Sequence, residues 1–215
     1  MGEEFSVVVL AGGQARRFGG VDKALLEICG RPMISYVLDV ASSLSPDVVV
    51  VVSSDEQVKA LSKLIRPEKA DVVIDEGELG PRCPLLGLIT GLKAVEHEKA
   101  LALACDMPLA SKAVLSFLAE VMSYMNASVP RWPNGYVEPL QAAYRTGKAI
   151  RAGEAVLKSG GDITMRSFLK ELGRVRYVST NVLEQLDPGL RTFTNVNTPA
   201  DARKAELALR ARGLC

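Results

Sequence analysis

Short runs of apolar residues constrain the fold more than any other feature of this sequence. Three runs stand out, at residues 5–10, 48–52 and 100–104, and a shorter fourth run covers residues 72–74. Apolar residues follow one another in these runs instead of alternating with polar ones, and most of them are β-branched. Strands that are apolar on both sides belong to a sheet that helices cover on both faces. The runs therefore predict the central strands of an α/β protein.

Helical patterns separate these runs. Apolar residues at helical spacing predict helices over residues 32–44, 55–65, 85–95 and 111–125. Ser54 and Gln57 form an S-x-x-Q capping box at the start of the second helix. Strands that alternate with helices indicate βαβ units with right-handed crossovers. We therefore expect a three-layer αβα architecture around a mainly parallel, Rossmann-like sheet.

The second half of the chain is less regular. We expect a strand over residues 139–144, helices near 149–158 and 164–172, and short strands at 174–178 and 193–196. Thr198 as N-cap, Pro199 at the first helical position and Asp201 three residues after the cap predict the last helix. No linker, repeat or low-complexity segment interrupts the sequence. Residues 1–215 therefore read as one domain whose C-terminal half folds over its sheet.

The charge balance and the histidine count exclude several classes of function. Lys and Arg number 26 and Asp and Glu number 25, which gives a net charge of +1. A nearly neutral chain is a poor nucleic-acid binder, because phosphate contacts require a basic surface. The single histidine, His97, excludes a His-rich zinc site and an H-E-x-x-H motif. A Ser-His-Asp triad would have to use His97, whose charged neighbours indicate a solvated helix end.

The cysteines and the beginning of the sequence bear on location. Cys29, Cys83, Cys105 and Cys215 contain no C-x-x-C pair, so zinc and thioredoxin-type sites have little support. The first residues are acidic, whereas a secretory leader begins basic and then turns apolar. No apolar stretch approaches the ~20 residues of a membrane helix. We therefore expect a cytoplasmic protein, without membrane contact, whose cysteines are reduced thiols.

The loop after the first strand carries the strongest functional signal. Residues 11–23 (AGGQARRFGGVDK) contain four glycines and the three cations Arg16, Arg17 and Lys23. Glycine leaves backbone N–H groups exposed and permits positive φ, so such a loop forms a cradle for anionic oxygens. Arginine offers a fork that matches phosphate, and lysine a point charge. The loop matches neither G-x-G-x-x-G nor the P-loop pattern, since Phe18 stands where the second P-loop glycine would be.

Two apolar runs end at an aspartate, Asp75 and Asp106. Ligands of open α/β sheets bind outside the carboxyl ends of the strands, which is where both residues fall. Pro108 stops the strand just after Asp106 and holds its carboxylate at the rim. Mg²⁺ is usually held by one or two carboxylates together with substrate phosphates, which suits Asp106. An aspartate in this position also serves as a turn former or helix cap, so that interpretation stays open for both.

Polar groups in the second half supply further candidates. Asn195 and Asn197 precede the last helix, share one side of the expected strand by alternation, and can bind phosphate or metal through their amides. An organising role in the turn is the alternative. Residues 138–141 and 162–167 are polar segments that can line a second substrate pocket.

These residues together resemble the molybdenum cofactor guanylyltransferase (MobA) family of nucleotidyltransferases, which has a glycosyltransferase-A-like fold. Residues 10–23 (LAGGQARRFGGVDK) are similar to that family's LAGG-x-x-R-R-[MF]-GG-x-D-K signature. Residues 84–88 (PLLGL), 105–108 (CDMP), 138–140 (EPL) and 195–199 (NVNTP) follow in the family's order. Ser53 stands where the best-known members have Asn, and Cys83 where many relatives have Gly. The resemblance implies a fold of the nucleotide-diphospho-sugar transferase type.

The resemblance also implies roles for individual residues. Lys23 would contact the nucleotide phosphates, Asp106 would hold Mg²⁺, and Asn195 and Asn197 would lie at the shared phosphate and metal region. Arg17 and Lys23 would neutralise the charge of the leaving group. The other implied nucleotide contacts are Leu10, Ala11, Gly12, Gly13, Ser53 and Asp75. Residues 1–110 would form a nucleotide-binding half, and residues 111–215 an acceptor-binding half.

The implied reaction transfers GMP from GTP to the terminal phosphate of molybdopterin and releases pyrophosphate, with Mg²⁺ required. Molybdoenzyme apoproteins and other maturation proteins of the molybdenum cofactor are the implied partners. One alternative is transfer from CTP, because spacing does not determine which base is bound, or the reaction of another nucleotidyltransferase of the same fold on a different phosphorylated acceptor. A second alternative is a non-catalytic module that binds the cofactor, and a third alternative is a hydride-transferring Rossmann enzyme. The first interpretation requires Lys23 and Asp106 to share one bound nucleotide.

Overall fold

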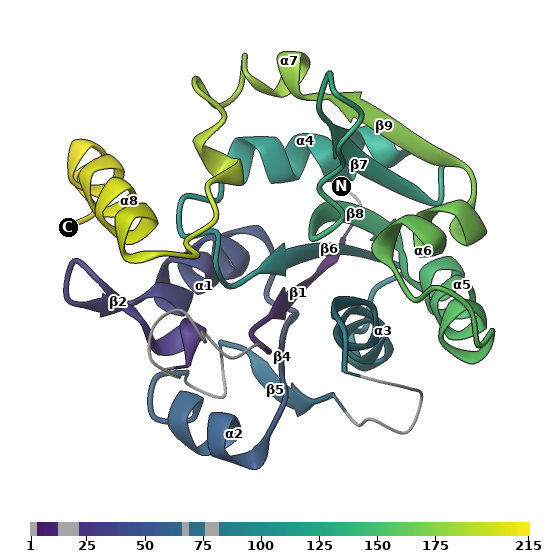
Figure 1. Ribbon diagram of the computed structural model, residues 1–215, viewed down its shortest axis with the longest axis horizontal. Coiled ribbons are helices and arrows are strands. Elements are labelled where there is room, and N and C mark those ends of the chain that lie inside the picture. Colours follow the sequence, from purple (N-terminus) through teal and green to yellow (C-terminus); the bar gives the residue numbers. More distant parts are fainter. Residues whose placement is uncertain (1–3, 13–21, 66–68, 76–81) are drawn as a thin grey trace.

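A seven-stranded sheet forms the centre of the molecule. The computed structural model describes residues 4–12, 22–65, 69–75 and 82–215 (Figure 1). The strand order is β5-β4-β1-β6-β8-β7-β9. The strands are β1 (Ser6–Leu10), β4 (Val48–Val52), β5 (Asp71–Ile74), β6 (Lys99–Ala104), β7 (Ala127–Arg131), β8 (Gln141–Arg145) and β9 (Val175–Ser179). Only β8 runs antiparallel to its two neighbours in this sheet.

Helices cover both faces of the sheet (Figure 1). One face packs against α1 (Met33–Leu44), α2 (Asp55–Leu61) and α4 (Lys112–Met122). The other face packs against α3 (Pro84–Ala94), α5 (Thr146–Lys158) and α6 (Met165–Leu172). The prediction of three layers around a mainly parallel sheet is confirmed.

The continuous apolar runs form these strands because each side of the sheet is buried. In β1, Val7 and Val9 face the α1 side, while Val8 and Leu10 face the α3 side, and none is more than 8% exposed. Helix α3 lies close against the sheet at Gly91, where a Cβ atom would overlap the side chain of Val8. The glycine therefore sets how closely helix and sheet approach.

Two segments differ from the sequence-based expectation. Strand β7 was not expected, because Pro130 disfavours a strand. Pro130 pairs with Val178 in the β9 ladder, while the β8 ladder pairs only with Ala127 and Ser128. The strand expected at residues 193–196 is wrong. The short 3-10 helix η4 (Arg191–Phe193) ends there, and the N–H of Val196 donates to the carbonyl of Asp106 instead of to a ladder.

The last helix, α8 (Pro199–Ala211), begins with the predicted capping box of Thr198 and Asp201. It packs on a small hairpin that the sequence did not reveal, β2 (Glu27–Ile28) and β3 (Arg31–Pro32). The hairpin turn contains Gly30, whose φ of +71° favours glycine. Two very short strands carry too few residues to show a hydrophobic period.

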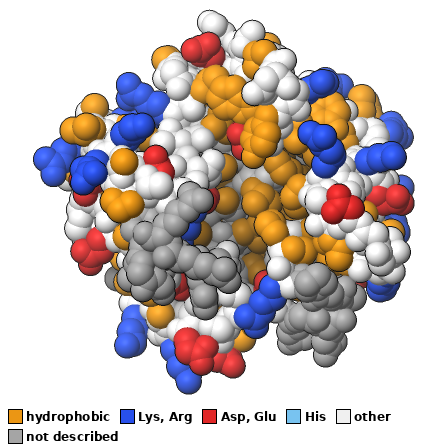
Figure 2. Space-filling view, viewed as in Figure 1, with side chains coloured by type: hydrophobic (Ala, Val, Ile, Leu, Met, Phe, Trp, Pro, Cys, Tyr) orange, Lys and Arg blue, Asp and Glu red, His pale blue; other side chains and the backbone are white. Residues whose placement is uncertain are grey.

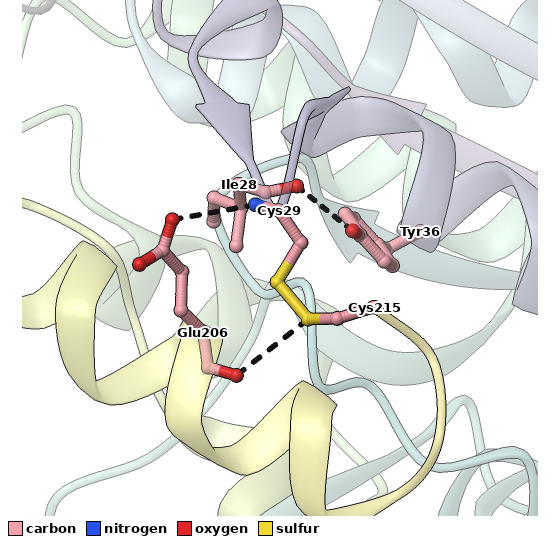
Figure 3. Close-up of a disulfide and its surroundings, with 5 residues drawn as sticks. All are labelled: Ile28, Cys29, Tyr36, Glu206 and Cys215. Atoms are coloured by element: carbon pink, nitrogen blue, oxygen red, sulfur yellow. Dashed lines mark hydrogen bonds between the residues drawn. A yellow bond between two sulfur atoms is a disulfide. The ribbon is translucent and has the colours of Figure 1, made fainter.

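A disulfide between Cys29 and Cys215 joins the hairpin to the segment after α8 (Figure 3). The two Cα atoms lie 5.3 Å apart. Around the bond, the N–H of Cys29 donates to Glu206 Oε1 at 3.3 Å, and the Tyr36 hydroxyl donates to the Ile28 carbonyl at 2.8 Å. The prediction of reduced thiols is therefore wrong for Cys29 and Cys215, because α8 packs against the hairpin and brings these distant residues together. Cys83 and Cys105 are free thiols.

Candidate active site

The carboxyl ends of β1, β4, β5 and β6 border a cleft of about 640 Å³. Its lining combines apolar and charged side chains, and Figure 2 shows hydrophobic side chains around a hollow in the middle of this face. The lining residues are Leu10, Gly12, Lys23, Val51, Ser53, Asp75, Arg82, Cys83, Pro84, Gly87, Ala104, Cys105, Asp106 and Leu140. The cleft lies where open α/β sheets place their ligands.

Lys23 and Asp106 are in direct contact in this cleft. Lys23 Nζ donates to Asp106 Oδ2 at 2.5 Å and to Asn197 Oδ1 at 2.5 Å. The side chains of Lys23 and Asp106 are 17% and 20% exposed, so solvent still reaches this ion pair. The other carboxylate oxygen, Asp106 Oδ1, is buried and has no hydrogen-bond partner among the described residues. Three residues from distant parts of the chain thus place a cation, a carboxylate and an amide together.

A short helical turn positions Lys23. Asp22 caps the 3-10 helix η2 (Lys23–Leu25), because its Oδ1 accepts from the N–H of Ala24 at 2.9 Å. Gln57 Nε2 donates to the other oxygen, Asp22 Oδ2, at 2.7 Å. Gln57 Oε1 in turn accepts from the N–H and the hydroxyl of Ser53 at 2.7 and 2.8 Å. Gln57 therefore links the end of β4 to the turn that carries Lys23.

This arrangement corrects the predicted capping box. Ser54 Oγ does accept from the N–H of Gln57, as an N-cap should. The Gln57 side chain, however, binds Ser53 and Asp22 in place of the Ser54 backbone. Asp22 and Gln57 thus belong to the site, although the sequence predicted only a helix-capping role for Gln57 and no separate role for Asp22. The only sequence signal for these two residues was their position. Asp22 is next to Lys23 in the loop after the first strand, and Gln57 follows closely after Ser53 at the end of β4.

Asp75 lies at the far end of the cleft, after β5. Its side chain is 9% exposed, and Oδ1 has no hydrogen-bond partner among the described residues, although Arg82 Nε approaches it to 3.8 Å. Burial raises the pKa of Asp75, and the Arg82 charge opposes that rise. The buried carboxylate oxygen is thus available to accept hydrogen bonds from a ligand.

The remaining nucleotide-side predictions have mixed outcomes. Leu10 and Gly12 line the cleft with Ser53, whereas Ala11 is fully buried behind it and donates its N–H to the Val51 carbonyl. Gly13 and Arg17 lie outside the described residues. Cys105 lies beside Asp106, and burial raises the pKa of its thiol.

The loop between β7 and β8 brings the second half of the chain to the cleft. Strand β7 ends, and the antiparallel β8 begins, at the same edge of the sheet as the end of β6. Leu140 from this loop lines the cleft, and Glu138 is buried with an exposed fraction of 8%. Trp132 Nε1 donates to Glu138 Oε1 at 2.8 Å. The polar segment at residues 138–141 therefore reaches the site edge.

Other sequence candidates lie elsewhere or have structural roles. Asn197 accepts a hydrogen bond from Lys23, whereas Asn195 is half-buried and makes no hydrogen bond to Lys23. In the segment 162–167, Thr164 caps α6 by accepting from the N–H of Ser167 at 3.1 Å. It thus contributes a helix cap, not a feature of the cleft.

His97 is at the opposite edge of the sheet, in the turn before β6. Its Nδ1 lies 3.1 Å from both Ser6 Oγ and Asp47 Oδ2, and its side chain is 23% exposed. The expectation of a solvated helix end is therefore wrong. The group is not a catalytic triad, because Ser6 is fully buried, donates to Asp47, and meets the same ring nitrogen as the aspartate. The cluster instead joins the starts of β1, β4 and β6.

The described residues contain no preformed cage for a metal ion. Within residues 4–12, 22–65, 69–75 and 82–215, no three His, Cys, Asp or Glu side chains gather as ligands. The unpaired Asp106 Oδ1 nonetheless suits a hard cation that takes most of its ligands from water and phosphate. The donor set therefore fits Mg²⁺ better than zinc.

Comparison with known proteins determines the family. The model of the MobA-like NTP transferase domain matches residues 7–175. The chain belongs to the MobA-like NTP transferase family. A molybdenum cofactor guanylyltransferase from Desulfosudis oleivorans is 32% identical to this MobA-like transferase over 205 residues, which cover 95% of each chain. A probable molybdenum cofactor guanylyltransferase from Thermococcus kodakarensis is 35% identical over 211 residues, which cover 91% of each chain.

Solved structures agree with the fold of this MobA-like transferase. Molybdopterin-guanine dinucleotide biosynthesis protein A from Archaeoglobus fulgidus matches it with a TM-score of 0.80 at 27% identity, over 96% of this chain and 100% of that one. A 2-C-methyl-D-erythritol 4-phosphate cytidylyltransferase from Thermus thermophilus matches with a TM-score of 0.68 at 19% identity, over 96% and 99%, which is a likeness of fold alone. The predictions of the family and of a nucleotidyltransferase enzyme are confirmed.

No helix in the part of the chain that the structure describes is both long and apolar enough to cross a membrane.

Proposed function

We propose that the protein transfers GMP from GTP to the terminal phosphate of molybdopterin, forming the guanine dinucleotide and releasing pyrophosphate. The observation that carries this proposal is the contact of Lys23 with Asp106 and Asn197 in the cleft. The names of the relatives from Desulfosudis oleivorans and Thermococcus kodakarensis support the same reaction. In this proposal residues 1–110 bind the nucleotide and residues 111–215 bind the acceptor.

The chemistry requires alignment and charge stabilisation more than acid–base groups. The attacking phosphate oxygen is already an anion, so no strong general base is needed. Lys23 binds the triphosphate, and its positive charge lowers the cost of negative charge on the leaving pyrophosphate. Binding requires Lys23 to exchange its contact with Asp106 for phosphate oxygens. Asp22 and Gln57 hold the lysine in place while this exchange occurs.

Asp106 is the residue that would hold Mg²⁺, through the buried oxygen that has no partner. Bound there, Mg²⁺ supplies positive charge to the triphosphate oxygens. Asn197 lies within reach of the same region through its contact with Lys23. Arg17, outside the described residues, is proposed to add a second cation to the leaving group.

Asp75 favours guanine over cytosine. The guanine edge presents two adjacent donors, N1–H and the 2-amino group, and a carboxylate accepts from both. Cytosine presents one amino donor beside an acceptor nitrogen, which a carboxylate would repel. The buried Asp75 oxygen without a partner therefore supports GTP as the substrate. Leu10, Gly12 and Ser53 line the path from Asp75 to Lys23.

Location and partners belong to the same proposal. The cytoplasm is the proposed location. Molybdoenzyme apoproteins and other maturation proteins are the proposed partners that receive the product.

A melting panel with each nucleoside triphosphate and Mg²⁺ tests the nucleotide assignment. A ligand at 100 times its Kd raises the free energy of unfolding by about 2.7 kcal/mol, so GTP should shift Tm clearly. A larger shift with CTP would overturn the guanine assignment. Pyrophosphate release on addition of molybdopterin then separates an enzyme from a binding module. Release that depends on both GTP and molybdopterin is the expected result, and no release would refute the transfer.

A further inference from the structure

Glu138 is a buried carboxylate that the nucleotide site does not use. It lies in the loop between β7 and β8, and only 8% of the residue is exposed. Its backbone is fixed on both sides, because its N–H donates to the Pro130 carbonyl at 3.0 Å and its carbonyl accepts from Gln141 at 3.2 Å. A buried acid is costly unless its oxygens are satisfied, so the partners of this carboxylate are informative.

One oxygen of Glu138 has a partner and the other does not. Oε1 accepts from the indole Nε1 of Trp132 at 2.8 Å, and Oε2 makes no hydrogen bond to any described residue. Burial raises the pKa of Glu138; the Trp132 hydrogen bond opposes this rise, and the charge of Asp106 adds to it. Glu138 is therefore near enough to Asp106 to sense its charge, and one oxygen remains free for a ligand.

The strand order places Glu138 and Asp75 on opposite sides of the Lys23–Asp106 pair. Asp75 follows β5, three strands from β6, which is about 14 Å at the usual spacing of ~4.8 Å. Glu138 lies between the end of β7 and the start of β8, one to two strands beyond β6, or roughly 5–10 Å. Two buried carboxylates thus flank the reaction centre along one edge of the sheet.

The two substrates of the proposed reaction carry the same chemical edge. Guanine and a pterin each contain a 2-amino-4-oxopyrimidine ring, with a ring N–H beside an amino group. A carboxylate accepts from both donors, and each of its oxygens has more than one lone pair, so Oε1 can keep its bond to Trp132. Charge-assisted hydrogen bonds of this kind are the stronger class.

We propose that Glu138 binds the 2-amino-4-oxo edge of the acceptor's pterin ring and so selects the acceptor, as Asp75 selects guanine. This inference rests on the proposed function, because it takes the acceptor to be a pterin phosphate. Glu138 then sets acceptor affinity, and Trp132 holds its carboxylate in the required orientation.

The test uses pterin-6-carboxylate and lumazine-6-carboxylate as probes. Lumazine carries an oxygen in place of the 2-amino group, so the pair differs at the edge in question. Trp132 is the only tryptophan of the chain and contacts Glu138, which makes its fluorescence a local reporter of binding. Titrations are run with saturating GTP and Mg²⁺, so that neither probe enters the guanine end of the cleft.

Wild type should bind pterin-6-carboxylate at least about tenfold more tightly than lumazine-6-carboxylate, the scale of one charge-assisted hydrogen bond. Glu138→Gln should abolish this preference. The amide oxygen of Gln still accepts from Trp132, so the loop keeps its internal hydrogen bond while the free oxygen becomes an NH₂ donor. Asp75→Asn is the matched control, because it removes the carboxylate at the other end and should leave the pterin preference intact.

Equal affinity of wild type for the two probes, or an unchanged preference in Glu138→Gln, would overturn the proposal. A loss of preference in Asp75→Asn would also overturn it, because the probe would then occupy the guanine end. The GTP-induced Tm shift is measured on the same samples. A missing shift in wild type refutes the proposed function, whereas a normal shift without pterin discrimination refutes only the role of Glu138.

Discussion

The backbone N–H of Val196 donates to the carbonyl oxygen of Asp106 across 2.9 Å, although the two residues lie far apart in the sequence. This bond joins the segment before α8 to the end of β6. It places Asn197 where its side chain can accept from Lys23, and Lys23 also contacts Asp106. The candidate centre is thus built from three chain segments that hold one another in position.

Replacement of Asp106 should impair the reaction more than binding. Asp106→Ala should lower kcat at least ~100-fold, the scale for loss of a preorganised electrostatic group. Pyrophosphate release at saturating GTP and acceptor measures the effect. Asp71→Ala, an exposed aspartate at the start of β5, is the control and should retain normal turnover. Near wild-type turnover in Asp106→Ala would remove Asp106 from the mechanism.

Gln57 should affect GTP binding without touching the nucleotide. Gln57→Ala removes the bonds to Ser53 and Asp22, and the turn that carries Lys23 loses its support. A loss of about 1–1.4 kcal/mol, the scale of one or two net hydrogen bonds, corresponds to a five- to tenfold weaker Kd for GTP. Calorimetric titration with GTP provides the measurement. Gln185→Ala, at an exposed site, should leave Kd unchanged; equal Kd values in both variants would contradict a positioning role for Gln57.

Asp75 should distinguish GTP from ITP, which lacks the 2-amino group. Wild type should bind GTP about tenfold or more tightly than ITP, because the buried carboxylate loses a charge-assisted hydrogen bond with ITP. Asp75→Asn should weaken GTP binding and reduce the ratio toward one. Competition between GTP and ITP in a binding assay measures this affinity ratio. If Asp75→Asn kept the wild-type preference for GTP over ITP, residues other than Asp75 would have to recognise guanine.

The cluster at the opposite edge should contribute a pH-dependent stability. Burial raises the pKa of Asp47, but hydrogen bonds from Ser6 and Glu96 and the interaction with His97 outweigh burial, so the pKa is lowered overall. A lowered pKa stabilises the folded protein above the unfolded value of 3.8, and this contribution is lost as pH falls through the folded pKa.

Asp47→Ala should therefore reduce the free energy of unfolding by about 1–3 kcal/mol at pH 7, the cost of leaving buried donors unpaired. The difference from wild type should diminish below pH ~4. Urea denaturation at several pH values measures both. A difference that stays constant down to the acid limit would show that the Asp47 charge is not responsible.

The disulfide should stabilise the fold under oxidising conditions. A cross-link contributes typically 2–4 kcal/mol, and more for long loops; Cys29 and Cys215 are separated by 186 positions. Cys215→Ser should lower Tm without reductant and make Tm insensitive to dithiothreitol. Cys83→Ser, which alters a free thiol, should behave like wild type. Mass measurement before and after alkylation checks the bond, and alkylation of all four cysteines without reduction would exclude it.

Much of the cleft follows from the sequence because parallel strands place their carboxyl ends at one edge. Runs that end at Ser53, Asp75 and Asp106 lead to one cleft once the strands are recognised. The partner of Lys23 could be expected for the same reason. The support that Gln57 gives to Asp22 could not be predicted, because the sequence is equally consistent with a local capping box. Only the packed structure brings Asp22 within reach of the Gln57 side chain.

The second half of the sheet was harder to predict, because its strands lack the continuous apolar signal. Strand β7 contains Ser128 and Pro130, and its edge neighbour β9 exposes Arg176 and Tyr177. The Cys29–Cys215 bond depends on contacts of α8 with a hairpin of two-residue strands. Such contacts produce no hydrophobic periodicity in the sequence, so they can be recognised only in the complete fold.

The reversed direction of β8 allows the proposed donor and acceptor sites to use different parts of one sheet. Because β8 starts at the edge where its neighbours end, the β7–β8 connection enters the cleft without rearranging β1, β4 or β5. Exchange of this single connection among homologues can therefore diversify what is modified while the donor nucleotide stays the same. The strands β1, β4 and β5 would then stay unchanged, while only the connection between β7 and β8 would vary.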